Sequence, residues 1–140
     1  MADPLLTLGD VDIGVRTVWM EARGEPYEGM KAVAHVLLNR VRWKDADRWN
    51  TIAQVCLDWL QFSGWRQADP NFAAALSVNF GDPAFRKCYR AFFEAMDEPD
   101  ITNGARHYYA PHAVIDTPAW AKGLQPCATI GNHVFFNNVT

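Results

Sequence analysis

The chain has 140 residues, of which 49% are hydrophobic, so we expect a single domain over residues 1–140 that needs neither disulfides nor a cofactor to fold. Thirteen basic residues against 16 acidic ones give a net charge of −3, which lacks the positive field that most nucleic-acid-binding proteins use to hold phosphates. No apolar run approaches the roughly 20 residues of a membrane-spanning helix, so we expect no membrane insertion.

The first two predicted elements are amphipathic helices joined by a tight corner. Apolar residues recur at spacings of three and four over residues 10–20, and Asp10 is placed to cap the first turn. Gly24 and Pro26 end this helix and allow a second one, which keeps the same apolar period over residues 26–41.

Shorter helices follow in the middle of the chain. The pattern predicts a short helix over residues 51–58, an irregular loop over 61–69 and two helices between 71 and 97. The last helix carries a stripe that we interpret as core rather than as a ligand site: Phe85, Cys88, Tyr89, Phe92, Phe93 and Met96.

The C-terminal part of the chain predicts a small β element. Residues 102–104 form a Thr-Asn-Gly turn signal, residues 106–110 alternate, and β-forming residues lie on both sides of Gly131 and Asn132. We therefore expect an α+β fold class, mainly helical, in which a helical lobe and a lobe with strands flank a cleft.

Three carboxylates lie close together at the corner between the first two helices. Glu21 follows Trp19 and Met20, so burial should disfavour its charged form and raise its pKa toward the range of a general acid. Glu25 and Glu28 are interpreted as complements to the positive end of the second helix.

The segment from Glu21 to Val41, EARGEPYEGMKAVAHVLLNRV, resembles the signature of the cell wall hydrolase family typified by the spore cortex-lytic enzyme SleB. Residues 51–56, 61–63, 100–109 and 129–136 resemble later blocks of that family in the same order. The resemblance implies a lysozyme-like, lytic transglycosylase-like domain that acts on the glycan strands of peptidoglycan. The expected bond is the β-1,4 link from N-acetylmuramic acid to N-acetylglucosamine, with Glu21 as the acid.

The same resemblance implies that one carboxyl group suffices. In a lytic transglycosylase the C6 hydroxyl of the muramoyl unit attacks its own anomeric carbon, so no water needs to be activated and Glu21 can act as acid and then as base. A hydrolytic muramidase remains open, because Asp58 or Asp116 could supply the second carboxylate of a conventional glycosidase.

The candidate substrate-binding residues lie in segments that match the family. They are Thr51, Gln61, Phe62, Ser63, Trp65, Tyr108, Tyr109, Asn132 and His133. The four loop residues either contact sugar or pack the loop, and Thr51 either lies near Glu21 or caps its helix. Adjacent tyrosines in a strand point to opposite faces, so only one should touch sugar. The pair at 132–133 either binds N-acetyl groups or, as we favour, holds its turn.

Other functions are weighed against the same residues. A zinc amidase is disfavoured and no metal site is expected, because His35, His107, His112 and His133 have no histidine partner three or four residues away. A cysteine peptidase is disfavoured because Cys56, Cys88 and Cys127 read as buried, reduced thiols. A non-catalytic peptidoglycan-binding module would not need a desolvated carboxyl at Glu21.

The N-terminus has no basic residue before an apolar stretch, so we expect synthesis in the cytoplasm without a signal peptide. We therefore expect a monomer that reaches the bacterial cell wall by phage-type release, as an endolysin does.

Overall fold

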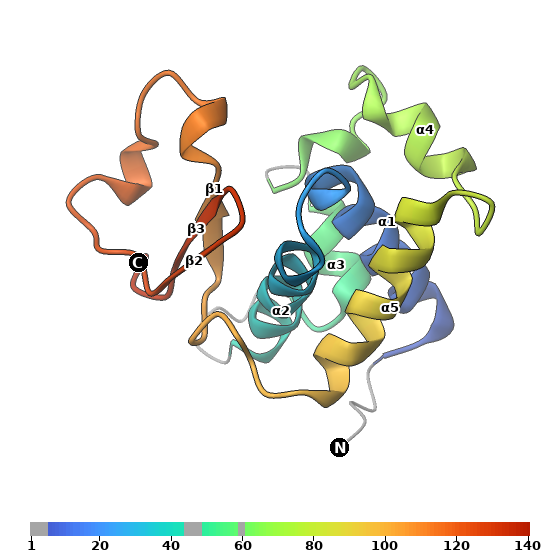
Figure 1. Cartoon of the computed structure of the whole chain (residues 1–140), viewed down its shortest axis with the longest axis horizontal. Coiled ribbons are helices and arrows are strands. Elements are labelled where there is room, and N and C mark those ends of the chain that lie inside the picture. Colours follow the sequence, from blue (N-terminus) through green and yellow to red (C-terminus); the bar gives the residue numbers. More distant parts are fainter. Residues whose placement is uncertain (1–5, 44–48, 59–60) are drawn as a thin grey trace.

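The computed structural model describes residues 6–43, 49–58 and 61–140, and the statements below concern this part of the chain (Figure 1). The expectation that the chain has no signal peptide depends on N-terminal residues that lie outside this described part. The helices are α1 (Leu8–Ala22), α2 (Tyr27–Arg42), α3 (Ile52–Leu57), α4 (Asn71–Ser77) and α5 (Pro83–Asp97). The strands are β1 (His107–Tyr109), β2 (Ala128–Ile130) and β3 (His133–Phe136), and short 3₁₀ helices cover Ser63–Trp65, Pro111–Ala113 and Ala119–Ala121.

The start of α1 differs from the sequence prediction. Thr7, not Asp10, is the N-cap, and Asp10 is the third helical residue of a capping box in which each side chain accepts the other's backbone N–H. The second carboxylate oxygen of Asp10 accepts the backbone N–H of Ala53 at 3.0 Å. Asp10 therefore both closes the first turn of α1 and ties α1 to α3.

The helical lobe, residues 8–97, has its core where α1, α2, α3 and α5 meet. On α5, the predicted core positions are confirmed for Phe85, Cys88 and Phe92, which are at most 2% exposed. Tyr89 and Met96 pack only partly against this core. The core assignment is wrong for Phe93, which is 42% exposed, because the predicted stripe was wider than the face of α5 that its neighbours cover.

Close packing between α1 and α5 depends on Gly14. A Cβ added there would lie 2.6 Å from a ring carbon of Phe92 and 3.1 Å from a methyl group of Ile52, both of them buried. The glycine thus lets the two helices approach, at the cost of some helix propensity.

Gly14→Ala should therefore lower the free energy of unfolding by about 1–3 kcal/mol, because the added methyl group overpacks a core whose side chains have no room to move. Chemical denaturation would measure this change. Gly24→Ala is the matched control, since its added Cβ meets no atom within 4 Å. Equal stability of the two variants would contradict the packing argument.

The β lobe, residues 107–136, is built on an antiparallel sheet with strand order β1-β3-β2. Tyr108 and Phe135 are paired in register, and with His133 they form the face that packs toward α2. Tyr109, Val134 and Phe136 form the opposite face, which is covered by Trp120 and Val139 in a separate apolar cluster. The alternation of Tyr108 and Tyr109 thus separates an inner face from an outer face.

The predicted turn at residues 102–104 joins the lobes. Asn103 and Gly104 have φ of 58° and 80°, in the left-handed region that such a turn requires. The Asp100 carboxylate accepts the backbone N–H of Thr102 and of Gly104, each at 2.8 Å. Asn39 on α2 donates to the same carboxylate at 2.8 Å, which holds the turn against α2.

The prediction of an α+β fold with a mainly helical body and a small sheet is confirmed. Among the described residues, no helix has both the length and the apolar character needed to cross a bilayer.

Candidate active site

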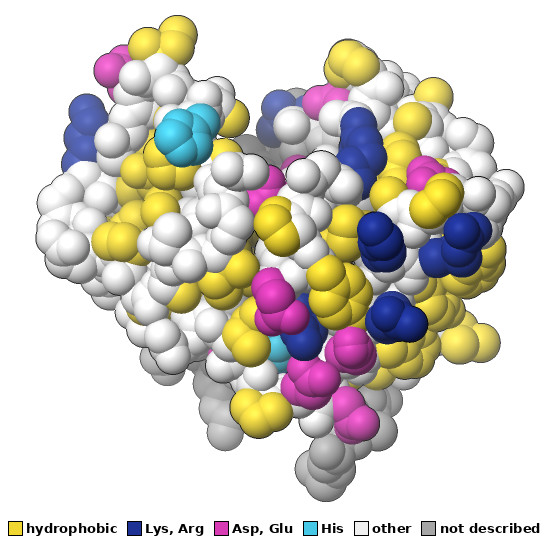
Figure 2. All heavy atoms as spheres, viewed as in Figure 1, with side chains coloured by type: hydrophobic (Ala, Val, Ile, Leu, Met, Phe, Trp, Pro, Cys, Tyr) yellow, Lys and Arg dark blue, Asp and Glu magenta, His cyan; other side chains and the backbone are white. Residues whose placement is uncertain are grey.

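Glu21 lies at the junction of the two lobes, in the last turn of α1. Figure 2 shows a deep hollow at the top of this face, between the β lobe and the helical lobe, and in Figure 1 the corner between α1 and α2 lies at its base. The hydroxyl group of Tyr108 on β1 donates a hydrogen bond to Oε1 of Glu21. A residue of the sheet therefore holds the carboxyl group of the helical lobe.

The surroundings of Glu21 favour its neutral form. Burial raises the pKa of Glu21, and the negative charge of Asp69 adds to this effect. The Tyr108 hydrogen bond and the positive charge of Arg40 act in the opposite direction, but the pKa remains above its ordinary value. Burial beside Glu21 raises the pKa of Tyr108 well above its usual range, so this hydroxyl stays a donor. A carboxyl group with a raised pKa keeps its proton to higher pH than an ordinary glutamate and can pass it to a leaving oxygen.

Arg40 is a buried cation close to this carboxyl group, and the sequence analysis missed it. It is 6% exposed. Its Nε donates to the backbone oxygen of Arg106 at 2.7 Å, and another guanidinium nitrogen donates to Oε1 of Gln61 at 3.0 Å. The guanidinium also lies over the ring of Phe62, 5.2 Å from its centroid. Arg40 thus joins α2, the 61–65 loop and the start of β1 around Glu21.

A sequence signal for Arg40 exists in the helical period. Arg40 lies seven residues after Val33 and three after Leu37, which places a charged side chain on the apolar face of α2. A cation at a core position needs partners, so this position was a candidate for a buried network. The period alone does not tell which groups those partners are.

Glu25 has a different role from the one predicted. Its two carboxylate oxygens accept the backbone N–H and the side-chain amide of Asn132, at 2.7 Å and 2.9 Å. Burial acts to raise the pKa of Glu25, but these hydrogen bonds outweigh it, and the pKa is lowered. Glu25 is therefore an ionised clasp between the α1–α2 corner and the β2–β3 turn, rather than only a complement to the start of α2.

The clasp explains the residues of the β2–β3 turn. Gly131 has φ of 59°, and a Cβ there would lie 2.5 Å from Oε1 of Glu25, so only glycine lets the turn approach the carboxylate. His133 is buried, with Nδ1 3.7 Å from the same oxygen and its ring edge-on to Tyr108. The structure thus places Asn132 and His133 in contacts that hold the turn, and His133 also contacts Tyr108.

The other predicted substrate-binding residues separate into two groups. Gln61 lies in the network around Glu21 through Arg40, and Ser63 is exposed on the same loop. Phe62 is buried in the helical core, and the indole N–H of Trp65 donates to the Thr17 hydroxyl at 2.9 Å. These two aromatic side chains pack the loop.

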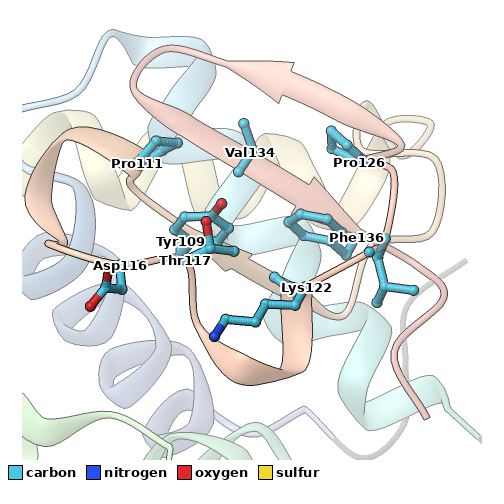
Figure 3. A pocket seen from close by; sticks show the side chains of 11 residues that line it. Tyr109, Pro111, Asp116, Thr117, Lys122, Pro126, Val134 and Phe136 are labelled. Carbon is cyan, nitrogen blue, oxygen red and sulfur yellow. The ribbon is translucent and has the colours of Figure 1, made fainter.

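Thr51 and Tyr109 lie in other contacts. Thr51 is the N-cap of α3, where its hydroxyl accepts the backbone N–H of Gln54 at 3.1 Å. Tyr109 lies on the outer face of the sheet, where it lines a pocket of about 550 Å³. Figure 3 shows it there together with Asp116 and Lys122. The adjacent tyrosines therefore serve different surfaces, and Tyr108 is the one that reaches Glu21.

The carboxylates considered as partners of Glu21 make contacts of their own. Asp58 accepts the indole N–H of Trp49 at 3.0 Å, and Asp116 lines the pocket on the outer face of the sheet. Asp69, in the loop before α4, is a carboxylate whose charge acts on Glu21, and the sequence did not single it out.

The side chains that a zinc amidase or a cysteine peptidase would use are distributed through the fold. In the described ranges, no three His, Cys, Asp or Glu side chains gather closely enough to hold a metal ion. Cys56, Cys88 and Cys127 are unpaired, and burial raises the pKa of the first two thiols to about 12. Thiols with such a pKa are poor nucleophiles at neutral pH.

Comparison with known proteins adds to this geometry. Residues 24–136 match the model of a family described as Cell Wall Hydrolase, a range that begins after Glu21. The spore cortex-lytic enzyme of Halalkalibacterium halodurans is 30% identical over 128 residues, which are 91% of this chain and 34% of that protein. The chain therefore spans about a third of the length of this curated relative.

Two solved structures share the fold. The catalytic domain of the Bacillus cereus SleB protein superposes with a TM-score of 0.74 at 26% identity, covering 96% of this chain and 94% of that one. The catalytic domain of a germination-specific lytic transglycosylase, SleB from Bacillus anthracis, gives 0.72 at 27% identity, covering 96% and 98%. Both comparisons extend over the helical lobe and the β lobe.

Proposed function

Because the chain belongs to the cell wall hydrolase family, we propose that it cleaves the glycan strands of peptidoglycan, with Glu21 as the catalytic acid. The observation that carries this proposal is the half-buried carboxyl group of Glu21, which has a raised pKa and is held by Tyr108 of the β lobe. The similarity to a spore cortex-lytic enzyme and to a lytic transglycosylase supports it. We therefore propose that the protein acts on the bacterial cell wall.

The proposed bond is the β-1,4 link between N-acetylmuramic acid and N-acetylglucosamine. Tyr108 occupies Oε1 of Glu21, which leaves Oε2 to carry the proton toward the glycosidic oxygen. Protonation breaks the bond between that oxygen and the anomeric carbon. The C6 hydroxyl of the muramoyl unit then attacks the anomeric carbon and returns its proton to Glu21, closing a 1,6-anhydro ring.

A hydrolytic muramidase is the second candidate. The observation that favours it is Asp69, whose negative charge acts on Glu21. Paired carboxylates with different pKa values are the usual arrangement of hydrolytic glycosidases, where the second group activates water or forms a covalent intermediate.

Mass spectrometry of the soluble products of purified peptidoglycan separates the candidates. We expect muropeptides that end in 1,6-anhydro-muramic acid, and a Glu21→Gln sample provides the control for contaminating activity. Reducing muramic ends would favour the muramidase and direct attention to Asp69. Free stem peptides would contradict glycosidic cleavage, and a lack of released products would favour a binding module.

The hydroxyl group of Tyr108 should affect the pH profile in a defined direction. The hydrogen bond from Tyr108 lowers the pKa of Glu21, so Tyr108→Phe should raise it further. Because the acid must be protonated, activity falls as pH rises through this pKa, and the falling limb should move to higher pH in the variant. We expect kcat to decrease by about tenfold, since Oε1 loses its donor.

A pH series of kcat/KM for both proteins would measure this shift. Tyr109→Phe is the matched control, because this hydroxyl lies on the outer face of the sheet. An unchanged limb in Tyr108→Phe, or an equal shift in both variants, would contradict a direct effect on Glu21.

A further inference from the structure

A groove of about 640 Å³ begins at the α1–α2 corner and runs toward the start of α5. Arg23 and Glu25 line its end at the corner, Tyr27 and Met30 line it from α2, and Lys87 and Arg90 line it from α5. Figure 2 shows Lys and Arg side chains gathered on the right of this face. Glu25 is also the residue of the clasp, so the groove adjoins the candidate active site.

Among the described residues, Lys87 and Arg90 of α5 have no ion-pair partner, whereas the carboxylates of the groove are hydrogen-bonded. In the described part of the chain, neither Lys87 nor Arg90 has a carboxylate within ion-pair distance, and both side chains are exposed. Glu25 is held by Asn132. Asp82 accepts the indole N–H of Trp19 at 3.1 Å and the first free N–H group of α5 at 2.8 Å. The groove therefore presents two cations without ion-pair partners beside carboxylates that already accept hydrogen bonds.

The charges of α5 run against its helix dipole. Arg86, Lys87 and Arg90 lie in the N-terminal half, while Glu94 and Asp97 lie in the last turn. The dipole acts mainly on the first and last turns, where it disfavours Arg86, Glu94 and Asp97, while the N-cap Asp82 complements it. A chain with net charge −3 thus places two cations, Lys87 and Arg90, on the face of α5 that lines the groove.

We propose that this groove binds the free carboxylates of the stem peptides on the glycan strand being cleaved. The inference rests on the proposed function, and it makes the peptide-bearing strand the preferred substrate. Lys87 and Arg90 would contact a carboxylate, while the half-buried ring of Tyr27 and the exposed ring of Pro26 offer apolar surface to the methyl groups of a short peptide.

The mixed lining favours a peptide over a phosphate polymer. A polyanion that followed the groove would meet the carboxylates of Glu25 and Asp82 as well as the cations. Like charges in contact are unfavourable, whereas a short peptide can present carboxylates to the cations and neutral groups elsewhere. Because the groove begins beside the α1–α2 corner, a stem peptide could enter it while its sugar chain lies in the hollow.

Binding measured in a Glu21→Gln background, which prevents turnover, tests the proposal. The probes are solubilised peptide-bearing strands, the same strands after an amidase has removed the peptides, and poly(glycerol phosphate). We expect Kd to be about tenfold lower for peptide-bearing than for stripped strands, with the difference shrinking at high salt. In Lys87→Gln/Arg90→Gln this ratio should fall to about one.

Arg42→Gln/Lys122→Gln removes the same charge from exposed positions outside the groove, and it should keep the ratio. Thermal unfolding of both double variants checks that they remain folded. A parental ratio near one, or an equal loss in the control, would overturn the proposal. Tight binding of poly(glycerol phosphate) that depends on Lys87 and Arg90, without a peptide preference, would reassign the groove to phosphate polymers.

The two proposals fail in different ways. Wild-type cleavage of both strand types at equal rates would overturn the peptide preference and leave the glycosidic activity intact. No cleavage of either strand type would overturn the proposed function, and the binding ratio would still test the groove.

Discussion

Glu21→Gln is expected to lower kcat for glycan cleavage by about 10³-fold, with little change in substrate binding. Gln retains the size of the side chain and can accept the Tyr108 hydrogen bond, but it has no proton to give to the leaving oxygen. Burial disfavours the charged form of Glu21, so replacing it with a neutral amide should not destabilise the fold. The loss should therefore appear in turnover and not in the midpoint of thermal unfolding.

Kinetics on purified glycan strands, with binding measured separately, would check this result. Glu28→Gln is the matched control: Glu28 lies in the first turn of α2, is exposed, and has Lys31 as a neighbour at 3.7 Å. We expect its activity to stay within about twofold of wild type, as for most exposed substitutions. More than a tenth of wild-type activity in Glu21→Gln would be incompatible with Glu21 as the acid.

The wild-type pH profile provides a second check on Glu21. Its pKa is raised, so the protonated form persists above the usual range for glutamate, and activity should fall only as pH rises through this higher value. Profiles of kcat/KM report the free enzyme, which is the state described here. If activity instead fell at the ordinary pKa of glutamate, the result would contradict the raised pKa that we attribute to burial.

Arg40→Met is expected to lower the free energy of unfolding by about 3 kcal/mol. The substitution leaves the backbone oxygen of Arg106 and the amide oxygen of Gln61 without the donors that now satisfy them. It also removes the guanidinium that packs over Phe62. Met retains part of the aliphatic volume, so most of the loss should come from the unsatisfied polar groups.

Urea denaturation of Arg40→Met and Arg42→Met would test this prediction. Arg42 lies on the same helix two residues later and is exposed, so its replacement should change stability by less than about 0.5 kcal/mol. Losing the positive charge of Arg40 should also raise the pKa of Glu21 and move the falling limb of activity to higher pH. Equal stabilities of the two variants would show that the network around Arg40 contributes little.

The local features of the chain were predictable because they depend on residues close together in sequence. The apolar period of α2, the corner at Gly24 and the left-handed turn at Asn103 and Gly104 are all present. The exact start of α1 was not predicted, because Thr7 and Asp10 are both good capping residues and only one of them can be the N-cap. The raised pKa of Glu21 followed from its apolar neighbours along the chain.

Only the tertiary structure shows which distant groups meet at Glu21. Tyr108 is 87 residues away and Asn132 is 107 residues from Glu25, so no periodicity connects them. The helices, the turns and the half-buried position of Glu21 could be predicted from the sequence, because hydrophobic period, caps and glycines act over a few residues. The fold decided that Tyr108 rather than Tyr109 holds Glu21, that Arg40 is its cation and that Glu25 is a clasp. These contacts depend on how the sheet packs against α2, and long-range packing is a property of the whole chain.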